Sequence, residues 1–182
     1  MGITQRLVYG AAKRWIAGKE MEAALANARE TNARGLGTIL NFLGEDITDP
    51  AVTEEHFAEY LSLQKAIADS GIDGCTSVKL TQLGLGSGDD SLVAQRATTL
   101  AESARSLGQM LWIDMEGSSF TTKTLDLYAE LYDGHKNVGV ALQAYLKRSE
   151  RDLERLMKIG GKVRLVKGAY KEPPELVFGS RA

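Results

Sequence analysis

Near its C-terminal end the chain reads Val163-Arg164-Leu165-Val166-Lys167-Gly168-Ala169-Tyr170. The first five residues form a short apolar run that carries two cations, and a run of this length is typical of a buried strand. Four comparable runs precede it, at residues 37–43, 75–80, 110–114 and 138–143. Longer segments separate the five runs. The sequence therefore predicts alternating strands and helices, the pattern of a parallel α/β sheet.

The segments between the runs repeat apolar residues three and four positions apart, which predicts amphipathic helices. Three such faces are Phe57, Tyr60, Leu61 and Ile67; Leu125, Leu127, Tyr128 and Leu131; and Leu153, Leu156 and Ile159. Two more helices are predicted ahead of the first strand, at about residues 5–17 and 20–33. Helix starts are expected at Thr53 and Ser149, and the glycines expected just past helix ends are Gly71, Gly108, Gly134 and Gly160.

Five βα units suit either a doubly wound sheet or a barrel. The turn after the first run, Leu43-Gly44-Glu45-Asp46, lacks the Gly-x-Gly-x-x-Gly fingerprint of dinucleotide-binding doubly wound folds. We therefore favour a TIM-like (βα)8 barrel, truncated here to about five βα units. Residues 1–35 are predicted to form N-terminal helices, and residues 36–182 the partial barrel.

Composition excludes several classes of function. Acidic residues outnumber basic ones by 24 to 22, so electrostatics alone would not hold nucleic acid. Cys75 is the single cysteine, which rules out an internal disulfide and fits a reducing compartment. No stretch approaches the roughly 18 apolar residues that span a bilayer. We expect a cytoplasmic protein with no metal, and a small-molecule partner.

Polar side chains recur where the predicted strands end. They are Glu45, Lys79, Asp114, Glu116, Gln143, Arg164 and Lys167. In a barrel these ends meet at one mouth, so the repetition indicates a site. Two other interpretations stay open: Lys79 and Asp114 form a purely structural ion pair, or Lys79 or Lys167 is the Schiff-base lysine of an aldolase.

At these strand ends the sequence resembles the flavin-dependent proline dehydrogenases. The resemblance rests on the string at 163–170 and on four others in register, Phe42-Leu43-Gly44-Glu45, Ser77-Val78-Lys79-Leu80, Trp112-Ile113-Asp114-Met115-Glu116 and Leu142-Gln143-Ala144-Tyr145-Leu146. It implies an FAD-dependent oxidation of L-proline to Δ1-pyrroline-5-carboxylate, with hydride passing to flavin N5 and electrons to a quinone. Contact with the inner membrane, if made, would be peripheral.

The resemblance also implies roles for individual residues. The catalytic set is Lys79, Asp114, Arg164 and Tyr170; the cofactor-binding set is Gln143, Arg164, Lys167 and Asp114; and the substrate-binding set is Lys79, Ala169, Tyr170 and Glu45. Lys79 would pair with the proline carboxylate, with Asp114 beside it. Arg164 would donate a hydrogen bond near flavin N5. Glu45 would face an arginine that comes later in the sequences of family members.

Family members continue with three more strands and a final helix that carries paired arginines. This chain ends at Ala182, so the resemblance implies that the C-terminal part of the barrel is missing. An inactive fragment or non-catalytic module therefore remains an alternative, and the oligomeric state stays open.

Overall fold

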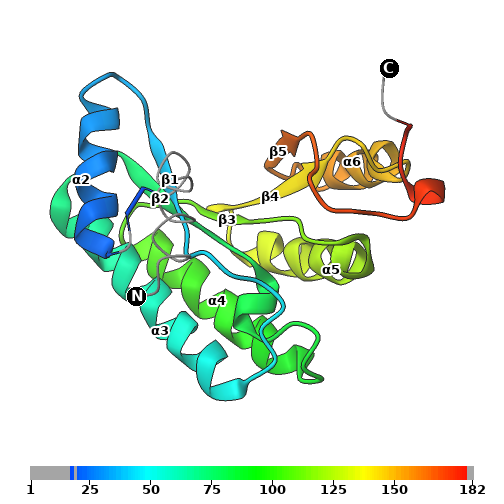
Figure 1. Cartoon of the computed structure of the whole chain (residues 1–182), viewed down its shortest axis with the longest axis horizontal. Coiled ribbons are helices and arrows are strands. Elements are labelled where there is room, and N and C mark those ends of the chain that lie inside the picture. The colour runs from blue at the N-terminus through cyan, green and yellow to red at the C-terminus, as the bar shows by residue number, and fades with distance from the viewer. Residues whose placement is uncertain (1–16, 19, 180–182) are drawn as a thin grey trace, which may run out of the picture.

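The computed structural model describes residues 17–18 and 20–179. Its centre is a single sheet of five parallel strands in the order β1-β2-β3-β4-β5 (Figure 1). The strands are β1 (Thr38–Leu40), β2 (Gly74–Val78), β3 (Leu111–Ile113), β4 (Val138–Gln143) and β5 (Val163–Val166). Each lies within or next to a predicted apolar run. Sequential parallel order is that of half a (βα)8 barrel, so the predicted fold class is confirmed.

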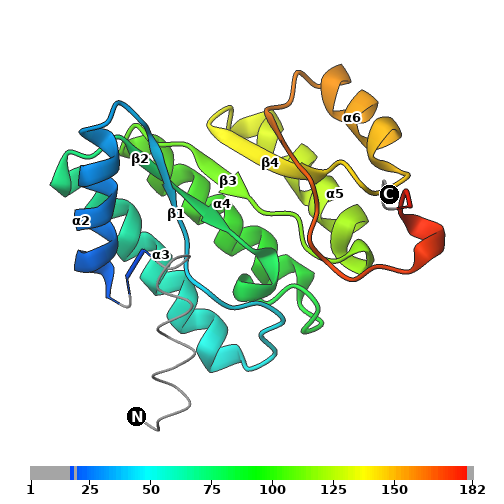
Figure 2. The same ribbon diagram turned by 45° about the horizontal axis from the view of Figure 1, so that its top comes forward.

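Helices connect successive strands and cover one face of the sheet (Figure 2). They are α2 (Met21–Asn32), α3 (Pro50–Ser70), α4 (Asp90–Ser106), α5 (Ser118–Gly134) and α6 (Ser149–Lys158), with short 3-10 helices η1 (Leu80–Leu83) and η2 (Pro174–Leu176). The second leading helix is thus confirmed as α2. The first, predicted at residues 5–17, falls almost wholly outside the described residues. Within the described part of the chain, no helix has the length and apolar character needed to cross a bilayer.

Helix starts differ from the prediction in a physically simple way. Helix α3 begins at Pro50, and the Asp49 side chain accepts a hydrogen bond from Ala51 N at 2.9 Å. Proline at the first position and a carboxylate cap together outweigh Thr53, which lies inside the helix and donates to Pro50 O. Ser149 is the first residue of α6 and not its cap, which is Arg148.

Helix ends follow the glycine signals closely. Gly71 caps α3 in the left-handed conformation with φ 66°, the geometry for which glycine is favoured. Gly108 directly follows the residue that caps α4, and Gly160 directly follows the residue that caps α6. Gly134 is different, because it is the last residue of α5 and His135 follows as the cap.

The core lies between the sheet and its helices. Val78, Leu111, Ile113 and Val140 point from β2, β3 and β4 into one buried cluster with α3, α4 and α5. A smaller cluster joins α2 to β1 and α3 through Ala28, Leu40, Leu63 and Ile67. Alternation along each strand sends the intervening side chains to the other face of the sheet, which is where the candidate site lies.

The inner face of β4 is built from small residues. Gly139 pairs in register with Trp112 of β3, and Ala141 pairs with Arg164 of β5. A Cβ placed at Gly139 would lie 2.6 Å from Cζ3 of Trp112, closer than van der Waals contact allows. Glycine at this position therefore lets the indole ring lie across the sheet.

Replacing Gly139 by alanine should lower the free energy of unfolding by about 2 kcal/mol, because the indole must move out of a packed position. Urea unfolding would measure the change. Gly134→Ala is the matched control, since no atom lies within 4 Å of a Cβ built there, and it should be neutral or slightly stabilising. Equal stability of the two variants would contradict this packing.

Candidate functional site

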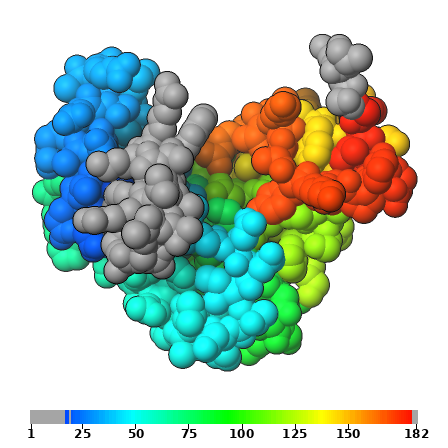
Figure 3. Space-filling model, in the orientation of Figure 1, coloured from blue at the N-terminus to red at the C-terminus, as the bar shows by residue number. Residues whose placement is uncertain are grey.

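Several of the polar strand-end residues, but not the exposed Lys167, contact one another on the inner side of the sheet. Figure 3 shows the N-terminal part of the described chain in blue and the C-terminal part in orange and red on opposite sides of the molecule. Ser77, Asp114 and Arg164 meet on the inner side of the sheet although they come from β2, the end of β3 and β5. The carboxyl ends of parallel strands converge in this way in barrel enzymes.

Asp114 and Arg164 form the central ion pair of this side. Arg164 Nη2 lies 2.5 Å from Asp114 Oδ1, and the side chains are 32% and 17% exposed. Ser77 Oγ donates to the same carboxylate oxygen at 2.9 Å. The guanidinium also lies 5.5 Å from the centroid of the Trp112 ring, a cation–π distance. Arg164 is therefore fixed on two sides, but its buried Nε has no partner among the described residues.

Lys79 does not form the expected contact with Asp114. Asp114 is engaged by Ser77 and Arg164, and no carboxylate of the described residues lies within ion-pair distance of the Lys79 ammonium. The longer, forked guanidinium reaches the carboxylate from two strands away. The idea of a structural Lys79–Asp114 pair is therefore wrong, and the half-buried Lys79 has no carboxylate partner among the described residues.

Glu116 has an environment that the sequence did not reveal. Its side chain is 2% exposed. Its Oε1 accepts from Thr81 N at 3.1 Å, and its Oε2 accepts from the Thr81 hydroxyl. Burial raises the pKa of Glu116, while the Thr81 hydrogen bonds and the charge of Lys79 oppose the shift. A buried carboxylate is costly unless it is hydrogen-bonded, so these contacts explain how it is tolerated.

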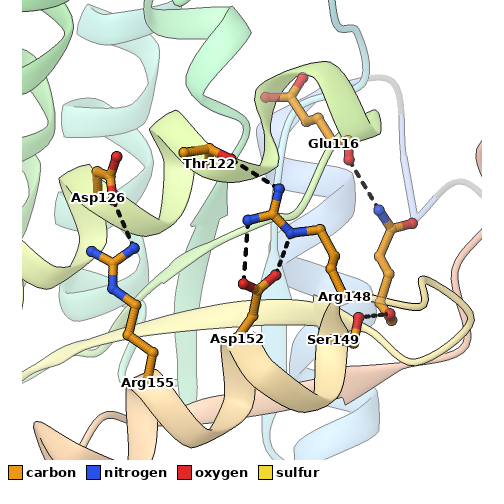
Figure 4. A network of polar contacts seen from close by, with 8 residues as sticks. Glu116, Thr122, Asp126, Arg148, Ser149, Asp152 and Arg155 are labelled. Atoms are coloured by element: carbon orange, nitrogen blue, oxygen red, sulfur yellow. Dashed lines mark hydrogen bonds and ion pairs between the residues drawn. The ribbon is translucent and has the colours of Figure 1, made fainter. Parts of the chain in front are cut away.

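Gln143, at the end of β4, is held from both sides. Its side-chain Nε2 donates to the main-chain carbonyl of Glu116 at 3.0 Å, and its main-chain carbonyl oxygen accepts from Ser149 Oγ. Figure 4 shows these contacts at the start of α6, where Arg148 bonds Asp152 and Thr122. The Gln143 side chain is 1% exposed, so its amide is fixed before any ligand binds.

Tyr170 and Glu45 close the mouth between the two outer strands. Tyr170 donates its hydroxyl hydrogen bond to Glu45 Oε2 at 2.5 Å, which joins the loops after β5 and β1. Burial has the largest effect in raising the pKa of Tyr170, and the carboxylate of Glu45 raises it further. The hydroxyl therefore stays protonated and donating. Glu45, predicted to face a later arginine, is here the partner of a tyrosine.

The turn before Tyr170 requires glycine. Gly168 has φ 100° and lies against the ring of Tyr145, so that any Cβ at this position would overlap the ring. Tyr145 in turn donates its hydroxyl to the carbonyl of Tyr170 at 2.8 Å. The string Gly168-Ala169-Tyr170 is thus shaped by close packing as well as by backbone strain.

Lys167 and Ala169 are exposed in this structure. An exposed Lys167 lacks the desolvated surroundings that make a lysine amine nucleophilic, which removes the physical basis for a Schiff base there. Within the described residues, no group of three or more potential metal ligands is assembled.

A cavity of about 310 Å³ lies at the opposite, amino-terminal end of β1 and β2. Asp73, Cys75 and Gln109 are among its lining residues. The strand-end polar residues do not line it. Because barrel chemistry collects at the carboxyl ends, this cavity is not the candidate site.

Comparison with known proteins agrees with the geometry. The family model described as proline dehydrogenase matches residues 24–174. "Proline dehydrogenase 2" of Bacillus subtilis is 33% identical over 172 residues, which cover 94% of this chain and 56% of the relative. "Proline dehydrogenase" of Deinococcus radiodurans is 29% identical over 184 residues, 99% of this chain and 59% of the relative. The chain thus spans just over half the length of these relatives.

A solved structure shares the fold. Proline utilization A (PutA) from Bdellovibrio bacteriovorus, inactivated by N-propargylglycine, superposes with a TM-score of 0.80. Its sequence is 23% identical, and the match covers 92% of this chain and 21% of that one. At this identity the likeness supports the barrel architecture alone.

The buried Glu116 predicts a pH-dependent stability. Because burial raises its pKa in the folded state, the folded chain binds this proton more tightly than the unfolded chain does. The stabilisation that Glu116 contributes is therefore fully present below its pKa in the unfolded chain. It is lost as pH rises through its raised pKa in the folded chain. Relative to Glu116→Gln, which cannot ionise, the wild type should lose stability between about pH 5 and about pH 8.

Urea unfolding of both proteins at the two pH values measures this difference. Glu154→Gln, an exposed position on α6, is the control for loss of a carboxylate and should show a smaller dependence. A wild type that gains stability over Glu116→Gln as pH rises would contradict the effect of burial.

Proposed function

Because the chain belongs to the proline dehydrogenase family, we propose that it forms the flavin- and proline-binding part of an enzyme that oxidises L-proline to Δ1-pyrroline-5-carboxylate. The observation that carries the proposal is the ion pair between Asp114, which follows β3, and Arg164 of β5, together with the fixed Gln143 at the end of the intervening strand β4. These side chains are fixed by contacts within the chain, as preorganised catalytic groups must be.

The polar groups of the inner face fit an isoalloxazine ring. Arg164 Nε is buried without a partner among the described residues, and an unmet buried donor is unfavourable unless a ligand accepts from it. A donor beside the flavin ring would stabilise the negative charge that develops there. Gln143 and Lys167 are proposed to bond the flavin or its chain, and Asp114 to hold Arg164 in place.

The substrate carboxylate would meet Lys79. This ammonium has no carboxylate partner among the described residues, and an opposite charge in a half-buried site is a strong attractor. Tyr170, held by Glu45, is proposed to close the pocket on one side, and Ala169 to line it. The exposed position of Ala169 leaves that face open toward a ligand.

Bound FAD would supply the redox chemistry, by accepting a hydride equivalent from the proline carbon next to nitrogen. The task of the chain is to hold substrate and cofactor in contact, to orient the carboxylate through Lys79 and to exclude water by means of Tyr170. The proposal includes a quinone as the final electron acceptor, a cytoplasmic location and membrane contact no closer than peripheral.

After incubation with FAD and removal of unbound cofactor by gel filtration, the purified chain should show a flavin band near about 450 nm, a property of the cofactor itself. Anaerobic addition of L-proline should bleach that band. Lys79→Met should weaken proline binding about tenfold or more, because a charge-assisted hydrogen bond is lost. Stopped-flow absorbance measures both steps.

Lys158→Met is the matched control, because Lys158 is exposed on α6, away from the strand ends, and it should bleach like the wild type. A chain that is folded by circular dichroism but retains no flavin after unbound FAD is removed would contradict the proposed function. So would a lysine adduct formed by borohydride with a keto substrate, the signature of an aldolase.

A further inference from the structure

Glu116 links segments at the ends of three neighbouring strands, β2, β3 and β4. Its carboxylate receives both the N–H and the hydroxyl of Thr81, which belongs to η1, the turn that follows Lys79. Its main-chain carbonyl receives the amide of Gln143. Glu116, which lies beyond the end of β3, thus contacts both the segment that follows β2 and the residue that ends β4.

Thr81 extends the connection to the loop after β1. Its hydroxyl oxygen accepts a hydrogen bond from Asp46 N at 2.9 Å, and Asp46 has φ 55°, an unusual conformation for a non-glycine residue. Glu45, the partner of Tyr170, is the neighbouring residue. The path from Glu116 through Thr81 therefore ends at the closing contact of the mouth.

The turn after Lys79 depends on such contacts for its shape. Gln82 Oε1 accepts from Lys79 N at 3.3 Å and from Tyr60 OH at 2.7 Å. Thr81 and Gln82 are both fully buried, so every polar atom there needs a partner. Loss of the Glu116 carboxylate would leave the Thr81 N–H without an acceptor.

We propose that Glu116 is a positioning residue, which acts through Thr81 and Gln143 to set the placement of Lys79 relative to the flavin-facing amide. It touches neither substrate nor cofactor. The inference rests on the proposed function, because it assigns Glu116 a role in proline binding. It predicts an effect on substrate affinity that exceeds the effect on turnover.

In the flavin-loaded chain, Glu116→Ala should raise the KM for L-proline about tenfold and leave kcat within about twofold, because Lys79 is misplaced in ground and transition states alike. Glu116→Gln should recover most of the affinity. Its carboxamide oxygen can still accept from Thr81 N, and its NH2 can donate to the Thr81 hydroxyl oxygen. Both variants lose the negative charge, so recovery of the affinity in Glu116→Gln but not in Glu116→Ala would assign the effect to hydrogen bonding.

Amide hydrogen exchange gives a readout that does not need the flavin. Glu116→Ala should speed exchange at Thr81 about tenfold or more, since a buried N–H loses its acceptor. If that variant does not fold, Thr81→Val tests the same contact. Thr124→Val is the control, because Thr124 is fully buried and its hydroxyl has no partner among the described residues.

Unchanged exchange at Thr81 would overturn the inference. Faster exchange with an unchanged KM would also overturn it, because the role would then be structural alone. A wild type without a flavin band would refute the proposed function separately. Exchange at Thr81 would in that case decide whether Glu116 positions the turn: acceleration supports it, and no change refutes it.

Discussion

The ion pair between Arg164 and Asp114 is the contact on which the candidate site depends. The two residues come from β5 and the end of β3, and β4 lies between their strands. The pair forms because β4 presents only Ala141 in register with Arg164, which leaves room for a long side chain to cross. Gly139 likewise leaves room for the side chain of Trp112, and the Arg164 guanidinium lies over the ring of Trp112.

From this pair the remaining strand-end groups take their positions. With Asp114 engaged by Arg164, Lys79 has no carboxylate partner among the described residues, and the Glu116 carboxylate accepts a hydrogen bond from the turn that follows Lys79. Gln143 and Tyr170 complete the mouth through separate contacts, with Glu116 and Glu45. Apart from Lys79, these polar groups are held by contacts within the chain, so the site would bind its ligands with little reorganisation.

The sequence predicted the strands well because short apolar runs between turns carry a strong signal. For helix α4, whose end Gly108 indicated, no apolar face was identified, since Ala97, Ala101 and Ala104 make up much of its buried face and alanine gives little amphipathic contrast. The strand-end residues were predictable by position, but their partners were not. Lys79 and Asp114 end neighbouring strands, and only side-chain length and the small residues of β4 direct Arg164 to Asp114. The burial of Glu116 depends on the fold of η1, for which the sequence holds no clear signal.

A double-mutant cycle on Asp114→Asn and Arg164→Gln, followed by urea unfolding, tests this picture most directly. The half-buried pair should show a coupling free energy of about 1–2 kcal/mol. The same cycle on Lys65 and Asp69, whose side chains are 71% and 65% exposed, should give no more than about 0.5 kcal/mol. Equal coupling in the two pairs would show that Arg164 does not depend on Asp114, and would contradict the account.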